Sequence, residues 1–142
     1  MLKFFNPEEE SQIIEAIQRA EAKTTGEIRV HLEDELDKDP VEQAVIVFQR
    51  LKMHKTRARN GVLILLAPEQ KQFAIIGDEG INKVVPEDFW DEERKLMLGH
   101  FRQGEFCQGL CRAIDLVGEK LKAHFPGVQD DENELPDEIS YN

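Results

Sequence analysis

The sequence predicts a three-layer α/β/α sandwich with a short mixed sheet. Residues 27–33 alternate between apolar and polar side chains, and a helical pattern then leads to a continuous apolar run at 61–67. Such a strand–helix–strand crossover places its two strands in parallel. A third strand at 72–76 follows after a short turn, so it should lie antiparallel to the second. With helical patterns before, between and after the strands, we expect helices on both faces of the sheet.

The segment before the first strand predicts a helix. Asn6 and Pro7 have the pattern of a helix start, a capping side chain followed by proline, and glutamates come next, near the positive end of the helix dipole. Apolar side chains then recur at helical spacing, at Ile13, Ile14, Ile17 and Ala20. Gly26 is the predicted left-handed residue that ends this helix.

The next three elements form the crossover. The first strand carries its apolar residues on one face, which predicts a strand covered on one side. Asp39 and Pro40 begin a second helix, and the second strand, GVLILLA, is typical of a central strand buried on both faces. The apolar stripe of the second helix is predicted at Val41, Ala44, Val45, Phe48 and Leu51.

The rest of the chain predicts two helices and a tail. One helix should start near Pro86 and end at Gly104, and the last should end before Pro126. The expected order is helix, strand, helix, strand, strand, helix, helix. We predict one domain over residues 1–127 and an acidic C-terminal tail over residues 128–142. Apolar residues near its end leave docking on the domain and disorder as equal alternatives for this tail.

The composition restricts the class of protein. The chain has 142 residues and a formal net charge of −11, and such an acidic surface disfavours binding to nucleic acid. The N-terminus does not have the pattern of a signal peptide, and no stretch is apolar enough to span a bilayer. Cys107 and Cys111 are four residues apart on a predicted helix, where they are poor disulfide partners. We therefore expect a cytoplasmic protein without a transmembrane segment.

Acidic side chains from separate segments are predicted to meet at one edge of the sheet. The starts of the two parallel strands share an edge, and the antiparallel third strand ends there, in the stretch IIGDEGIN at 75–82. Calcium relieves the repulsion between crowded carboxylates, and magnesium is the alternative ion. The candidate metal ligands are Glu27, Asp78, Glu79, Asp88 and Asp91. The competing interpretation is that Arg57, Arg59 and Lys83 neutralise these acids by ion pairing.

Four motifs in order along the chain resemble the TPM domain family. They are TGEIRV at 25–30, RNGVL at 59–63, FAIIG at 73–77, and a phenylalanine–glycine spacing across 101–110. The chain is similar to the cytosolic, single-domain branch of the family. The resemblance implies an α/β/α sandwich, a divalent metal site, usually for calcium, in the loop after Gly77, and phosphatase activity as claimed for plant relatives.

Two functions follow as hypotheses. The first is a calcium-binding interaction or regulatory module with an unknown protein partner. The second is a metal-dependent phosphatase acting on phosphomonoesters, in which Asp78 or Glu27 would be the general base and Arg57 or Arg59 would hold the phosphate. The sequence has no motif that is diagnostic of phosphoryl transfer, so the module is favoured. The spacing of His100, Cys107, Cys111 and His124 fits no standard zinc site.

Overall fold

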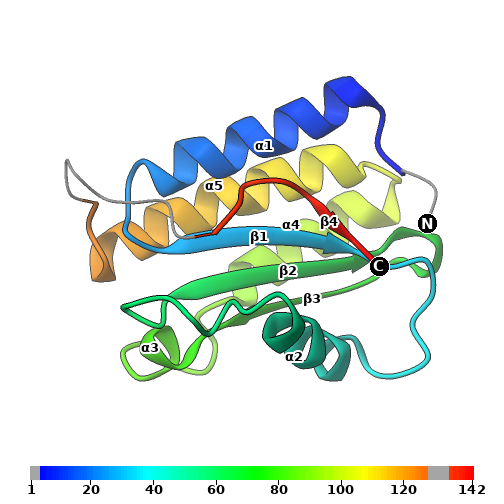
Figure 1. The fold of residues 1–142 in the computed structure, drawn as a ribbon. Coiled ribbons are helices and arrows are strands. Elements are labelled where there is room, and N and C mark those ends of the chain that lie inside the picture. Colours follow the sequence, from blue (N-terminus) through cyan, green and yellow to red (C-terminus); the bar gives the residue numbers. More distant parts are fainter. Residues whose placement is uncertain (1–3, 128–134) are drawn as a thin grey trace.

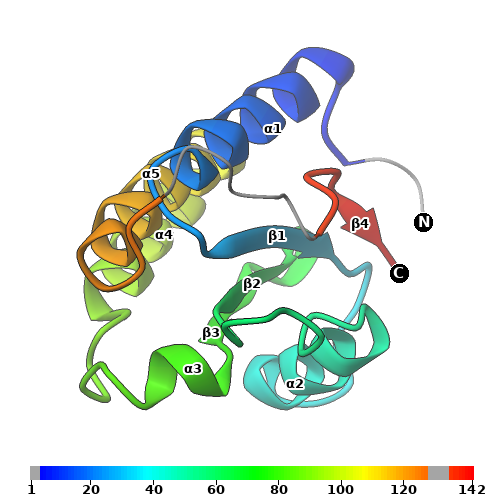
Figure 2. The same ribbon diagram turned by 60° about the vertical axis from the view of Figure 1, so that its left-hand side comes forward.

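The computed structural model describes residues 4–127 and 135–142, and within them it has a four-stranded sheet in the order β3-β2-β1-β4 (Figure 1). Helices cover both faces of this sheet (Figure 2). In chain order the elements are α1 (Pro7–Glu21), β1 (Glu27–Leu32), α2 (Pro40–Arg50), β2 (Gly61–Ala67), the 3₁₀ turn η1 (Pro68–Gln70), β3 (Gln72–Gly77), α3 (Glu79–Asn82), α4 (Asp91–Arg102), α5 (Phe106–His124) and β4 (Ser140–Tyr141).

The sheet is mixed, as predicted. β1 and β2 are parallel, with Glu27 opposite Gly61 at their starts. β3 is antiparallel to β2, and its last residue, Gly77, lies opposite Val62. The starts of β1 and β2 and the end of β3 therefore lie at one end of the sheet, which confirms the predicted meeting of these three termini.

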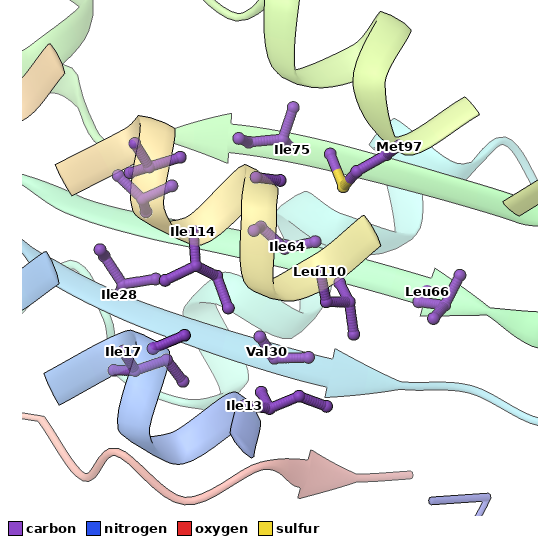
Figure 3. Packing of buried hydrophobic residues seen from close by; sticks show 14 of the residues in the cluster. Ile13, Ile17, Ile28, Val30, Ile64, Leu66, Ile75, Met97, Leu110 and Ile114 are labelled. Carbon is purple, nitrogen blue, oxygen red and sulfur yellow. The ribbon is translucent and has the colours of Figure 1, made fainter. Parts of the chain in front are cut away.

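Two apolar layers enclose the sheet. The larger layer lies between the sheet and α1, α4 and α5, and it contains alternate residues of β1 and β2 such as Val30 and Ile64 (Figure 3). The smaller layer lies under α2 and contains Leu63 and Leu65 of β2. All seven residues of β2 are buried. The three-layer α/β/α class is thus confirmed.

Two predicted helix starts are confirmed at the level of single hydrogen bonds. The Asn6 side chain accepts a bond from the Glu9 backbone N–H at 2.8 Å, and the Glu9 carboxylate accepts one from the Asn6 N–H at 3.0 Å. The Asp39 carboxylate accepts bonds from the N–H groups of Val41 and Glu42. Each cap satisfies N–H groups that have no partner within the helix.

The expected role of Gly26 is wrong. Among the described glycines only Gly104 has a positive φ, and α1 ends earlier, at Glu21. Gly26 instead lies close to α5: a Cβ there would lie 2.7 Å from Leu121 Cδ1, so the leucine side chain would have to shift.

Two helices differ in detail from the predictions. α4 begins at Asp91 rather than near Pro86, because a turn closed by the Phe89 N–H and the Pro86 carbonyl comes first. The buried face of α2 consists of Ala44, Val47 and Phe48, whereas Val41 and Val45 are about half exposed, at 49% and 48%. Val45 is therefore available to line a surface cleft.

The end of the chain docks on the domain. β4 pairs with β1 in parallel, His31 opposite Ser140 and Leu32 opposite Tyr141. Leu135 and Ile139 are buried, one in each apolar layer. Docking is therefore what the structure shows for residues 135–142, whereas the first part of the predicted tail, 128–134, lies outside the described residues.

The packing of α1 on α5 gives a test of this core. A Cβ added at Gly118 would lie 2.7 Å from the Cβ and 2.8 Å from the Cα of Ala20, whereas one at Gly99, in α4, has no neighbour within 4 Å. We expect Gly118→Ala to lower the free energy of unfolding by about 1–3 kcal/mol, through overpacking. Gly99→Ala should raise the free energy of unfolding by about 0.5–1 kcal/mol, because alanine favours a helix more than glycine does. At position 99 the new methyl group meets no neighbour, whereas at position 118 it collides with Ala20. Urea unfolding measures both, and equal effects would contradict the packing of α1 on α5.

Candidate functional site

Asp78 is the buried acid at the end of β3. Its backbone N–H donates to the Gly61 carbonyl at 2.9 Å, which continues the β2–β3 ladder by one residue. Its carboxylate accepts a bond from the Glu79 N–H at 2.8 Å and caps the single turn of α3. The stretch Gly77–Gly80 is thus a strand end and a helix cap. The residue is only 6% exposed, so its carboxylate needs a positively charged partner.

Arg59 provides that partner. Its Nε and Nη2 donate to Asp78 Oδ2 and Oδ1 at 2.8 and 2.9 Å, and its Nη1 donates to Glu79 Oε1 at 3.0 Å. Paired bonds of this kind are among the strongest charge-assisted contacts in proteins. The hydrogen bond to Asp78 raises the pKa of Arg59 above its ordinary value, so the guanidinium stays charged. Of the two interpretations left open by the sequence, ion pairing therefore holds for Asp78 and Glu79.

The backbone holds Arg59 against the turn of α3. Arg59 has a left-handed conformation, with φ of 51°, and its carbonyl accepts a bond from the Gly80 N–H at 2.8 Å. A Cβ at Gly80 would lie 2.2 Å from the Ala58 carbonyl oxygen. Gly80 is therefore needed for close contact between two backbone segments.

A cleft of about 210 Å³ opens beside the two carboxylates. One wall comes from α2, with Val45 and Phe48, and another from Arg59 and the end of β3. His54 also lines it, and the buried Nδ1 of His54 has no hydrogen-bond partner among the described residues. The cleft thus has both an apolar wall and charged groups at its edge.

The other three predicted ligands do not join Asp78 and Glu79. Glu27 is buried at the same end of the sheet, but β2 separates β1 from β3, which puts the two backbones about 10 Å apart. Asp88 is exposed between α3 and α4, and Asp91 begins α4, where it pairs with Arg94 at 2.8 Å. Within residues 4–127 and 135–142, no three His, Cys, Asp or Glu side chains are grouped so as to hold a metal ion.

The two acids that do converge fit a hard divalent cation in their chemistry. Both offer carboxylate oxygens, the ligands that calcium and magnesium prefer. Together with Arg59 they leave one net negative charge, so the cluster still attracts cations. Arg59 now holds both oxygens of Asp78 and one of Glu79, and an ion would have to take its place on them.

A second polar cluster, which sequence reasoning missed, lies at the opposite end of β1. His31 and Glu33 are 2% and 4% exposed. The Nδ1 of His31 contacts Ser140 Oγ at 2.8 Å, and its Nε2 contacts Glu33 Oε1 at 3.2 Å. Gln43 of α2 also donates to Glu33 Oε1, at 2.8 Å. The cluster ties the C-terminal strand to β1 and α2. A clue in the sequence was that residues 31 and 33 project from the same face of one strand.

Burial sets the protonation of this cluster. Desolvation lowers the pKa of His31 below its ordinary value, and Arg50 and Arg29 add to this, while the neighbouring Glu33 carboxylate opposes it. The folded chain therefore favours the neutral imidazole.

Sequence reasoning also missed a buried ion pair. Glu93 of α4 is fully buried, and its Oε1 accepts a bond from Lys120 Nζ at 2.9 Å. Its place one turn before Met97 and two before Phe101, on the buried face of α4, was the available signal. The pair joins α4 to α5, and neither residue lines the cleft beside Asp78.

The cysteines do not form a reactive or zinc site. Both thiols are free, and burial raises the pKa of Cys111 to about 12 and that of Cys107 above its ordinary value. Neither is therefore a thiolate at neutral pH.

The mixed sheet between helical layers defines an α/β/α sandwich domain, and solved structures share it. The NMR structure of the BA42 protein from the psychrophilic bacterium Bizionia argentinensis is 47% identical, with a TM-score of 0.94 over 100% of this chain and 98% of that one. The N-terminal domain of the cg2496 protein from Corynebacterium glutamicum is 16% identical, with a TM-score of 0.67 over 98% of this chain and 80% of that one, and shows the fold alone.

The family model described as the TPM domain matches residues 2–120, and the chain therefore belongs to the TPM domain family. No curated protein matches the chain. Among the helices that the structure describes, none has the length and hydropathy that a membrane crossing requires.

The lowered pKa of His31 predicts a pH dependence of stability. In the unfolded chain His31 titrates near its ordinary value of 6.5, so its stabilising contribution is complete above that pH and is lost as the pH falls towards the lowered folded value. We expect the difference in free energy of unfolding between the wild type and His31→Gln to shrink between pH 7.5 and pH 5. Urea unfolding at several pH values measures this difference.

The same substitution at the exposed His124 is the matched control. A difference that stays constant with pH for His31→Gln would contradict the assignment of a neutral, buried imidazole.

Proposed function

We propose that this domain binds a divalent cation at the Asp78–Glu79 end of the sheet and acts as an interaction or regulatory module. The observation that supports this most is the convergence of two carboxylates on one positively charged group beside a cleft. The guanidinium of Arg59 marks a point at which the folded chain stabilises positive charge. The resemblance of the four sequence motifs to the TPM domain family implies a divalent metal site in the loop after Gly77.

Calcium is the proposed ion, and magnesium is the alternative. Asp78 and Glu79 would hold it, and water would complete a coordination shell of oxygen atoms. When bound, the ion would supply fixed positive charge at the edge of the cleft. Glu27, Asp88 and Asp91 stay predictions as further ligands. A site with two protein carboxylates should be weak and should respond to changes in ion concentration, as suits a regulatory role.

A metal-dependent phosphatase is the second candidate, because Arg59 and His54 both line the cleft. A phosphatase needs a cationic side chain that is free to hold phosphate and a general base that is free to accept a proton. Here Arg59 and Asp78 are bound to one another, so neither is free in this arrangement. The sequence also has no motif that is diagnostic of phosphoryl transfer, and this is the reason to favour the module.

The proposed partner is a protein, and the proposed location is the cytoplasm. On α2, Val41, Val45 and Ile46 are each more than 40% exposed, and Val45 is the one of them that lines the cleft. The free, protonated thiols of Cys107 and Cys111 suit a reducing compartment.

Calcium titration of the purified chain tests the cation site. We expect Asp78→Asn to weaken calcium binding at least about tenfold, because it removes the buried carboxylate charge while asparagine remains a good helix cap. Isothermal titration calorimetry measures the affinity, and the fluorescence of Trp90 in the segment after α3 gives a second signal. Asp115→Asn, at an exposed acid paired with Arg19, is the matched control and should bind as the wild type does.

The same proteins distinguish the two candidate functions. Release of phosphate from an aryl phosphate that requires the ion and is lost in Asp78→Asn would favour the enzyme. Ion binding without turnover would favour the module. Absence of binding by calcium and by magnesium in the folded wild type would reject the cation site.

A further inference from the structure

We infer that Arg59 is a built-in competitor for the cation, so that the guanidinium and a divalent ion occupy the same carboxylates in turn. The inference rests on the proposed function, and it concerns how that site is regulated. It assigns to this arginine a role that neither the fold nor the family match specifies.

The contacts of Arg59 exclude simultaneous occupation. Three of its N–H groups point at the site, and they cover both oxygens of Asp78 and one oxygen of Glu79. Calcium binds carboxylate oxygens at roughly 2.3–2.6 Å. An ion on those oxygens would lie against the guanidinium, and two positive charges at that separation repel strongly when one of them is partly removed from water. One cation must leave before the other binds.

The exposures of the three side chains show which group moves. The Asp78 side chain is only 6% exposed, so its carboxylate is fixed and needs a cation at all times. The side chains of Arg59 and Glu79 are 38% and 54% exposed. Water can therefore hydrate the Arg59 guanidinium when it leaves the site. Water cannot hydrate the buried Asp78 carboxylate in its place. This asymmetry lets one positive charge replace another at Asp78.

The exchange would change the cleft. Arg59 is one of the residues that line it, and the Arg59 backbone is bound to the turn of α3 through the Gly80 N–H. Withdrawal of the guanidinium from Asp78 and Glu79 presents an unpaired positive charge at the edge of the cleft, while the backbone stays in place. Ion binding is thereby converted into a change of surface charge next to the apolar wall of α2.

Substitution of Arg59 tests the competition. We expect Arg59→Gln to bind calcium at least about tenfold more tightly than the wild type in calorimetric titration, because the two carboxylates lose their competitor. Arg19→Gln is the matched control, since it removes a guanidinium from an acid outside the site, Asp115, and it should bind as the wild type does. Thermal unfolding gives a second measurement: with a chelator Arg59→Gln should melt below the wild type, and calcium should raise its melting temperature more than that of the wild type.

The outcomes separate this inference from the proposed function. Equal or weaker calcium binding by Arg59→Gln, when the wild type binds, would overturn the competition and leave the cation site standing. Absence of binding by both folded proteins would reject the cation site and the competition together. If Arg59→Gln does not fold, Arg59→Lys keeps the charge but loses the paired geometry. It should then bind calcium more tightly than the wild type, and unchanged affinity would overturn the inference.

Discussion

The burial of β2 on both faces is the constraint on which the rest of this structure depends. All seven residues of the strand are buried, so its two faces need separate apolar layers. Val62, Ile64 and Leu66 on one face pack under α1, α4 and α5. Leu63 and Leu65 on the other face pack under α2. A strand placed in this way must have a hydrogen-bonded neighbour on each side, because its backbone groups cannot reach water. β1 and β3 are those neighbours, and they fix which chain ends meet.

The two helical layers are unequal, and this explains where the polar clusters lie. Three helices of 12 to 19 residues, α1, α4 and α5, cover one face, whereas α2, with eleven residues, lies over the other (Figure 2). Polar groups can therefore gather on the α2 side at each end of the sheet. Arg59 and Asp78 meet near the starts of β1 and β2, and His31 and Glu33 meet near the end of β1. α2 contributes to both, through the cleft at one end and through Gln43 at the other.

Charge at the first of these clusters, that of Arg59, Asp78 and Glu79, is partly neutralised by one arginine, in a chain that is strongly acidic as a whole. Asp78 is buried and fixed, and its one strong partner comes from the segment that enters β2. A single guanidinium serves two adjacent acids, so the cluster keeps a net negative charge. This combination links the fold to the proposed function, because the groups that close the loop would also respond to an ion.

The fold was largely predictable, and the reason lies in local patterns. Asn6 and Asp39 cap their helices within three residues of themselves, and the apolar run at 61–67 specifies a central strand without reference to distant residues. The site was predictable only in part. The topology correctly brought Glu27 and Asp78 to one end, but it gave no distance across β2 and no choice among Arg57, Arg59 and Lys83 as partners. That distance and that choice of partner depend on where side chains point in the folded domain, which short-range sequence patterns do not specify.

The sequence by itself determined the order of the main helices and strands and the mixed sheet, because strand and helix periodicities and short crossovers leave few topologies. Its resemblance to the TPM domain family came from four short motifs. Tertiary structure alone decided that Arg59 holds Asp78, that His31 is buried beside the C-terminal strand, and that Gly26 lies close to Leu121 rather than in a left-handed turn. The physical reason is that each of these depends on atoms from segments far apart in the chain. Their separations are set by packing of the whole domain and not by neighbours in sequence.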